Sequence, residues 1–133
     1  MRYWVLANMS EAAVTEESFE FDEGFDLVEY ATRSFGVFQE EPVDVVLRFA
    51  PEVAADARSF LFHPGQEMET NDDSSLTVRF RAGGTREMCW HLFTWGDAVT
   101  VEKPGKLRLQ IAEMCSRFAG HHRTGPVATQ DAD

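Results

Sequence analysis

Cysteine and histidine are the residues whose chemistry is most reactive in this sequence, and both occur in the segment TREMCWHLFTW at residues 85–95. A thiolate beside an imidazole can act as a nucleophile with its general base. We expect a helix here, with Thr85 as N-cap and Gly96 as its stop. Residues two apart on a helix do not face each other, so Cys89 and His91 cannot meet. The sequence places no carboxylate to orient His91, and we expect no catalytic residues and no enzyme activity.

The same segment predicts a contact surface. Its apolar residues leave almost no polar face; they are Met88, Cys89, Trp90, Leu92, Phe93 and Trp95. A helix that is apolar on nearly every side is buried on more than one side. One sheet covers only one of those sides. We therefore expect Trp90, Phe93 and Trp95 to contact a second subunit or another domain.

Composition limits the other classes of function. The chain has 133 residues, enough for one domain, and a formal net charge of −11, which disfavours direct binding to nucleic acid or to an anionic membrane. No apolar run approaches the roughly 20 residues that span a bilayer, and no signal peptide is recognisable, so we expect a cytoplasmic protein. Cys89 and Cys115 both lie in apolar helical patterns and are expected to be reduced core thiols. No metal-spaced Cys/His cluster or phosphate-binding glycine motif occurs, so neither metal nor cofactor is expected.

Hydrophobic periodicity predicts a regular order of elements from Val43 onward. Strands are expected at residues 43–49, 66–70, 75–82 and 98–102, and helices at residues 51–62, 85–95 and 106–118, the last ending at Gly120. The order is β-α-β-β-α-β followed by a helix. This order predicts the α+β class and a ferredoxin-like split βαβ fold, in which helices cover one face of an antiparallel sheet. Before it we expect a strand at residues 3–6, a shorter extended piece and a short helical connector.

Three arginines are expected on the uncovered face of that sheet. The first and third strands of such a sheet lie side by side, which would bring Arg48 near Arg79 and Arg81. A guanidinium cluster suits a carboxylate or phosphate, so these residues are candidates for binding an anionic effector. The alternative is ordinary cross-strand pairing, with Glu67 or Glu69 on one neighbouring strand and Glu102 on the other. For His63 we expect a structural role, with its imidazole capping carbonyls at a helix end.

Several short motifs occur in order at plausible spacing: Ser34-Phe35-Gly36, His63-Pro64-Gly65-Gln66, Trp95-Gly96, and the stretch from Glu102 to Arg108. Together they resemble the WCX C-terminal extension of bacterial WYL-domain transcriptional regulators, from about Arg2 to Phe118. The start, RYWVLANM, is similar to the last strand of a WYL domain, although Ala7 and Asn8 depart from the Asp and Arg of that pattern. In the family this Arg belongs to a basic pocket for nucleotide-like effectors.

The resemblance implies a division into remnant WYL strands (1–22), a helical connector (23–42), a ferredoxin-like WCX domain (43–120) and a disordered tail (121–133). It implies a regulatory and dimerisation domain that works as a homodimer and relays binding of an anionic or nucleotide-like effector. DNA would be contacted only through an N-terminal domain absent from this chain. Two other functions stay open: a small dimeric enzyme with a cleft near His91, and a free-standing small-molecule-binding module.

Overall fold

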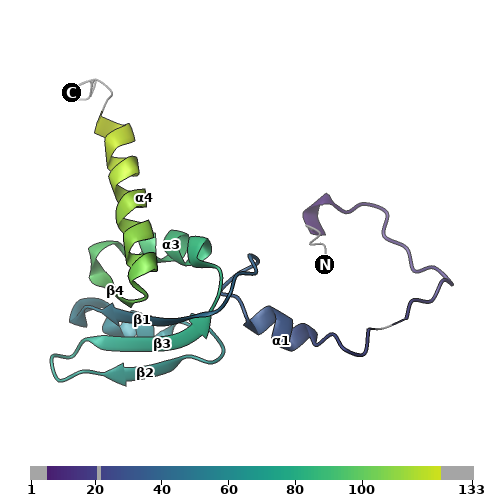
Figure 1. The fold of residues 1–133 in the computed structure, drawn as a ribbon, viewed down its shortest axis with the longest axis horizontal. Coiled ribbons are helices and arrows are strands. Elements are labelled where there is room, and N and C mark those ends of the chain that lie inside the picture. The colour runs from purple at the N-terminus through teal and green to yellow at the C-terminus, as the bar shows by residue number, and fades with distance from the viewer. Residues whose placement is uncertain (1–5, 21, 124–133) are drawn as a thin grey trace, which may run out of the picture.

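A four-stranded antiparallel sheet forms the centre of the protein, seen here in a computed structural model that describes residues 6–20 and 22–123 (Figure 1). Its strands are β1 (Val43–Phe49), β2 (Glu67–Thr70), β3 (Leu76–Ala82) and β4 (Val99–Lys103), in the order β2-β3-β1-β4. As predicted, β1 and β3 are the central pair, and Val45 lies opposite Phe80 in their register. The α+β class is confirmed.

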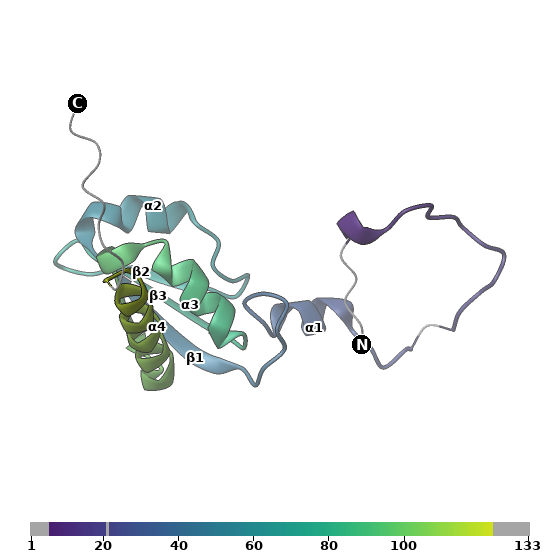
Figure 2. The ribbon, with the colours of Figure 1, turned by 90° about the horizontal axis from the view of Figure 1, so that it is seen from above.

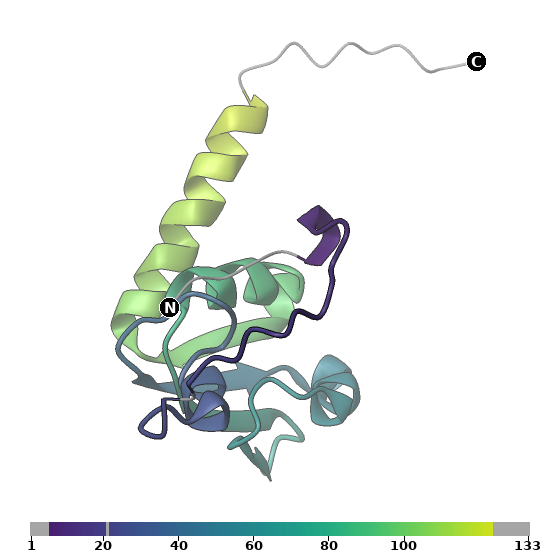
Figure 3. The same cartoon turned by 90° about the vertical axis from the view of Figure 1, so that its right-hand side faces the viewer.

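The helices cover one side of this sheet. After β1 come a 3-10 turn (Pro51–Val53) and α2 (Ala54–Ser59); α3 (Thr85–Phe93) follows β3, and α4 (Gly105–Arg123) follows β4. α3 and α4 lie on the same side of the sheet, and the C-terminal half of α4 projects beyond the rest of the domain (Figures 1 and 3). The ferredoxin-like assignment itself stays a prediction, since α2 has six residues and buries only Ala57.

The core lies between the sheet and these helices, and strand alternation determines its composition. Val45, Leu47 and Phe49 of β1 are buried, while the residues between them point to the opposite face. The other fully buried large side chains are Leu76 and Val78 of β3, Met88 of α3 and Leu107 of α4.

Helix ends differ from the predictions at three places. α2 ends at Ser59, because the Gln66 side chain accepts from the N–H groups of Phe62 and His63 and so holds that segment out of the helix. Gly84, in the left-handed conformation, is the N-cap of α3 instead of Thr85. α4 continues through Gly120 to Arg123. The predicted tail is therefore helical over residues 121–123, and the rest of it lies outside the described residues.

One further expectation needs correction. Cys115 is exposed, whereas Cys89 is buried, so only one of the two thiols belongs to the core. The expected strand at residues 3–6 falls mostly outside the described residues, and Leu6–Asn8 form a 3-10 turn. The described residues before β1 contain that turn and α1 (Leu27–Thr32) but no strand. A strand needs a hydrogen-bonding partner, and this segment runs away from the sheet (Figures 1 and 2).

Candidate functional site

The connector after α1 is fixed against the end of β3. Phe35 donates its N–H to the Gly83 carbonyl at 3.0 Å, and Gly83 donates to the Arg33 carbonyl at 2.8 Å, so Ser34 and Gly83 form a short parallel bridge. Phe35 packs against the core, with its ring centroid 6.1 Å from that of Phe80. The Ser-Phe-Gly motif is therefore where the connector attaches to the domain.

Two carboxylates then hold the connector to the first turn of α3. Glu87 accepts the N–H groups of Val37 and Phe38, both at 3.1 Å. Glu40 reaches the other way and accepts from the N–H and the hydroxyl of Thr85, both at 2.9 Å. The bond from the Thr85 N–H is the main reason that the pKa of Glu40 lies below its usual value. We call residues 33–40 with Gly83, Thr85 and Glu87 the connector clamp.

His63 ties α1 to the same region. Its Nδ1 accepts the Gly65 N–H at 3.0 Å, which places the proton of a neutral ring on Nε2. Nε2 then donates to the Thr32 carbonyl at 2.6 Å, at the C-terminal end of α1. The predicted capping role holds, but His63 caps a helix 31 residues earlier, not the helix before it.

Cys89 and His91 have different surroundings, and Cys89 lines a hollow between α3 and α4. His91 lies among aromatic rings, including Phe35 and Phe60, and its Nε2 accepts from the Trp95 indole at 3.2 Å. Burial lowers the pKa of His91, and burial also raises the pKa of the Cys89 thiol. For both groups burial therefore favours the neutral form, which suits packing. No group of three or more possible metal ligands occurs within residues 6–20 and 22–123.

The three sheet arginines all lie on the uncovered face, and each has an acidic partner. Arg79 pairs with Glu69 at 2.8 Å, and Arg81 pairs with Asp44 at 2.9 Å. Arg48 lies 2.7 Å from Asp73 and 3.8 Å from Glu102. Of the partners named from the sequence, Glu69 and Glu102 take part, while Asp44 and Asp73 were missed. An anionic effector on this face stays a prediction, and it would have to displace these carboxylates.

The pKa of Asp73 is strongly lowered by its hydrogen bonds. Its carboxylate accepts the Ser75 hydroxyl at 2.6 Å, the Ser75 N–H at 3.1 Å and Arg48 at 2.7 Å. These bonds, the Ser75 hydroxyl first, lower the pKa of Asp73 to about 2. The Ser75 hydroxyl also accepts from Asn71 at 2.8 Å, so the network closes the β2–β3 turn.

We expect this network to make a contribution to the free energy of unfolding that is lost at low pH. A carboxyl whose pKa is lower in the folded than in the unfolded chain stabilises the fold above its unfolded pKa and loses this effect as pH falls. For Asp73 the loss should occur between pH 4 and pH 2. Urea unfolding at pH 5 and pH 2.5 should therefore show a smaller drop for Asp73→Asn than for the wild type. Asp72→Asn, at an exposed neighbour in the same turn, is the control and should keep the wild-type drop.

The three predicted interface aromatics separate into two groups. Trp90 and Phe93 expose 53% and 43% of their surface. Trp95 is half-buried, and its ring packs edge-on against Phe49 with centroids 5.0 Å apart. Trp95 therefore serves the core of its own domain, because its segment turns toward the sheet after Phe93.

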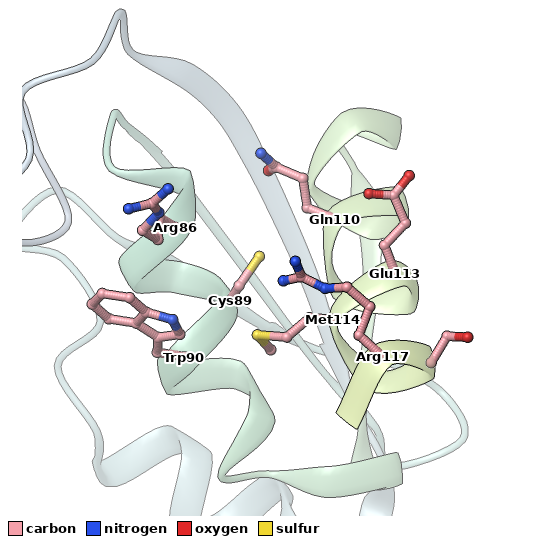
Figure 4. A pocket seen from close by; sticks show the side chains of 8 residues that line it. Arg86, Cys89, Trp90, Gln110, Glu113, Met114 and Arg117 are labelled. Carbon is pink, nitrogen blue, oxygen red and sulfur yellow. The ribbon is translucent and has the colours of Figure 1, made fainter. Parts of the chain in front are cut away.

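A groove between α3 and α4, not anticipated from the sequence, begins beside Trp90. It has a volume of about 470 Å³ and is lined by Arg86, Cys89, Trp90, Gln110, Glu113, Met114, Ser116 and Arg117 (Figure 4). The Arg117 side chain extends from α4 toward α3. A second hollow of about 260 Å³ shares Trp90 and Met114 with it and adds Phe93 and Phe118. We call the two together the α3/α4 groove. The α3 residues and the α4 residues of the groove are at least 17 positions apart in the sequence, so no local pattern could have indicated it.

The fold and its contacts define a small α+β domain, to which the segment containing α1 is attached through the connector clamp. The WCX domain model matches residues 41–119, and the chain belongs to this family, the C-terminal domains of WYL-type transcriptional regulators. Comparison with curated proteins finds no match. Among solved structures, the chain is similar to proteasome accessory factor B/C (PafBC) of Arthrobacter aurescens, with 12% identity and a TM-score of 0.50. The match covers 87% of this chain and 18% of that protein. No helix in the described part is long and apolar enough to cross a membrane.

Proposed function

We propose that this domain pairs two subunits of a WYL-type regulator and transmits the state of that pair to the upstream domains through its connector. DNA would be contacted only by domains outside this chain. The observation that carries the proposal is that α3 has both the hydrogen bonds to the connector and the exposed aromatic residues. The first turn of α3 is bonded to the connector through Thr85 and Glu87, and its exposed side presents Trp90 and Phe93.

The two parts of α3 are close enough to be coupled. Phe38, whose N–H is held by Glu87, also lies edge-on to Trp90 with ring centroids 6.3 Å apart. Thus Phe38, a residue of the connector clamp, also contacts Trp90. Trp90 forms the proposed pairing surface together with Phe93 and Phe118. A subunit that covers Trp90 would restrict Phe38, and through it the residues that lead back to α1. Coupling between two sites requires a structural element whose conformation both sites influence. We propose that this element is α3 together with the connector bound to it.

The pairing surface has the composition of an interface hot spot. Trp90, Phe93 and Phe118 are exposed and adjacent, with the rings of Phe93 and Phe118 5.4 Å apart. Large aromatic residues dominate the energetics of protein interfaces. The predicted anionic effector stays part of the proposal. An effector bound to Arg48, Arg79 and Arg81 would alter the sheet from the face opposite α3.

The test combines oligomeric state with amide exchange. The chain should sediment as a dimer, and Trp90→Ser with Phe93→Ser should weaken the dimer by at least about 2 kcal/mol, the usual effect of losing a hot-spot aromatic. Amide exchange at Val37 and Phe38 should then be faster in the variant, because the covered ring no longer restrains the connector. Leu61→Ser, which removes an apolar residue 68% exposed on another surface, is the matched control.

Different results would reject different parts of the proposal. If the double variant still forms the dimer, the pairing surface lies elsewhere. If the dimer is lost while exchange at Val37 and Phe38 is unchanged, pairing through α3 holds and transmission to the connector does not.

A further inference from the structure

The α3/α4 groove combines free positive charge with an apolar floor. Within the part of the chain that the structure describes, neither Arg86 nor Arg117 forms an ion pair, in contrast to Arg48, Arg79 and Arg81. Beyond them the floor is formed by Trp90, Met114, Phe93 and Phe118. Glu113 is the one acidic residue among the described residues of the lining, so two arginines leave the groove with a net positive charge. A ligand for this groove should therefore carry acidic groups next to large apolar ones.

A buried hydrogen-bond acceptor in the groove also lacks its donor. Gln110 lines the groove from α4, and its Oε1 is buried with no hydrogen-bond partner among the described atoms. Leaving such a buried acceptor unpaired is unfavourable. A backbone N–H of an extended peptide would satisfy it once the Gln110 amide turned toward the groove.

The chain contains a segment with the complementary chemistry. Residues 16–25 read EESFEFDEGF, with five acidic residues, three phenylalanines and no basic residue. Among the described ones, Phe19 exposes 78% of its surface. α4, by contrast, contains four Lys and Arg residues and one acidic residue in a chain of net charge −11. Charge is therefore segregated between the N-terminal segment and the helix that forms one wall of the groove.

The position of α1 directs this segment away from the groove of its own subunit. The N-terminal end of α1 is capped by Asp26, which accepts from Val28 and Glu29 at 2.8 and 3.0 Å. Its C-terminal end is held by the bond between His63 and the Thr32 carbonyl. The chain before α1 runs away from α3 and α4 in both views (Figures 1 and 2). A groove on a second copy is thus the better acceptor, and a two-fold arrangement satisfies both grooves at once.

We propose that residues 16–25 of one copy dock in the α3/α4 groove of a second copy, and that the exchange is reciprocal. Carboxylates of the segment pair with Arg86 and Arg117, and its phenylalanine side chains cover Trp90 and Phe93. This inference rests on the pairing part of the proposed function and specifies how the pair is held.

A charge-swap experiment on the full chain tests the exchange. One variant reverses the segment (Glu16→Lys, Glu17→Lys and Glu20→Lys), and the other reverses the groove (Arg86→Glu and Arg117→Glu). In a homodimer of either variant, the segment and the groove carry charges of the same sign. The dimer dissociation constant should therefore rise at least about 100-fold. Mixed one to one, the basic segment meets the acidic groove and the acidic segment meets the basic groove. Sedimentation should show the mixed dimer restored to near the wild-type constant.

The control variants carry the same charge changes on other surfaces. Glu67→Lys, Asp72→Lys and Asp97→Lys match the first variant at exposed positions, and Arg58→Glu with Lys103→Glu matches the second. Both controls should dimerise like the wild type, and circular dichroism confirms folding of every variant. Dimers that persist in both reversed variants would overturn the exchange but leave pairing intact. So would reversed variants that stay monomeric when mixed. A wild-type chain that is monomeric at all concentrations would overturn exchange and pairing together.

Discussion

Replacing Gly83 with alanine is expected to detach the connector from the domain and to destabilise the fold by about 1–3 kcal/mol, the usual cost of forcing extra atoms into a packed site. A Cβ at this position would lie 2.4 Å from the Glu40 carbonyl oxygen and 2.9 Å from its carbon. These are backbone atoms, and they are held in place because the Glu40 side chain is bonded to Thr85. Gly83 is also bonded to Arg33 and Phe35 on its other side. The connector must therefore move away.

The expected result has two measurable parts. Urea unfolding should show the loss of stability, and amide exchange of residues 34–40 should rise, while β1 and β3 keep their protection at low urea. Gly120→Ala is the matched control, because a Cβ there meets nothing within 4 Å. Since alanine is favoured over glycine in a helix, the control should be neutral or more stable by up to about 1 kcal/mol. Unchanged stability and exchange in Gly83→Ala would show that the connector is not held by this contact.

The sheet could be predicted because the pattern that indicates each strand lies within a few consecutive residues. Alternation at residues 43–49 and 76–82 distinguishes Leu47 and Val78, which are buried, from Arg48 and Arg79, which are exposed on the other face. Once β2 and β3 are joined by a short turn, Glu67 lies directly opposite Arg79 and Glu69 lies diagonal to it, so the ion pair with Glu69 was among the predicted alternatives. Cross-strand neighbours follow from the strand order together with the register that the turn sets.

The connector clamp could not be predicted in the same way. Glu40 and Thr85 are 45 residues apart, and Glu87 bonds to backbone N–H groups 49 and 50 residues away. Neither carboxylate stands out among the 23 acidic residues. The one signal was the Ser-Phe-Gly motif, which the family resemblance picked out without a physical reason. The structure supplies that reason in the contact between this motif and Gly83.

Helix ends show the same limit. Gly96 was expected to end α3, and it has a positive φ of 60°, just beyond the end of the helix at Phe93. Gly120 was expected to end α4 by the same rule, yet the described glycines with positive φ are Gly84 and Gly96 only. A glycine ends a helix only where it adopts the left-handed conformation. The sequence contains the residue in both cases but does not state which conformation it takes.

Replacing Phe49 with alanine should be the most damaging single change in the core, at about 3–5 kcal/mol for a fully buried aromatic ring. Phe49 has no exposed surface, and its ring lies 5.2 Å from that of Phe62 and 5.0 Å from that of Trp95. Both neighbours contact His91, so the cavity would open beside the helix that carries the clamp and the pairing surface. The surrounding rings are rigid and belong to different elements, which limits how far they can collapse into the space.

Urea unfolding of Phe49→Ala, followed by tryptophan fluorescence and by circular dichroism, measures this effect. Val46→Ala is the matched control, since Val46 lies on the same strand with its side chain on the uncovered face and is only half-buried. The control should lose about 1 kcal/mol or less, in line with the smaller apolar area that it removes from contact. Equal losses in the two variants would mean that Phe49 and Trp95 do not form the centre of the core. A large loss in Phe49→Ala alone would also be expected to weaken the dimer, because Trp90 and Phe93 depend on the position of α3.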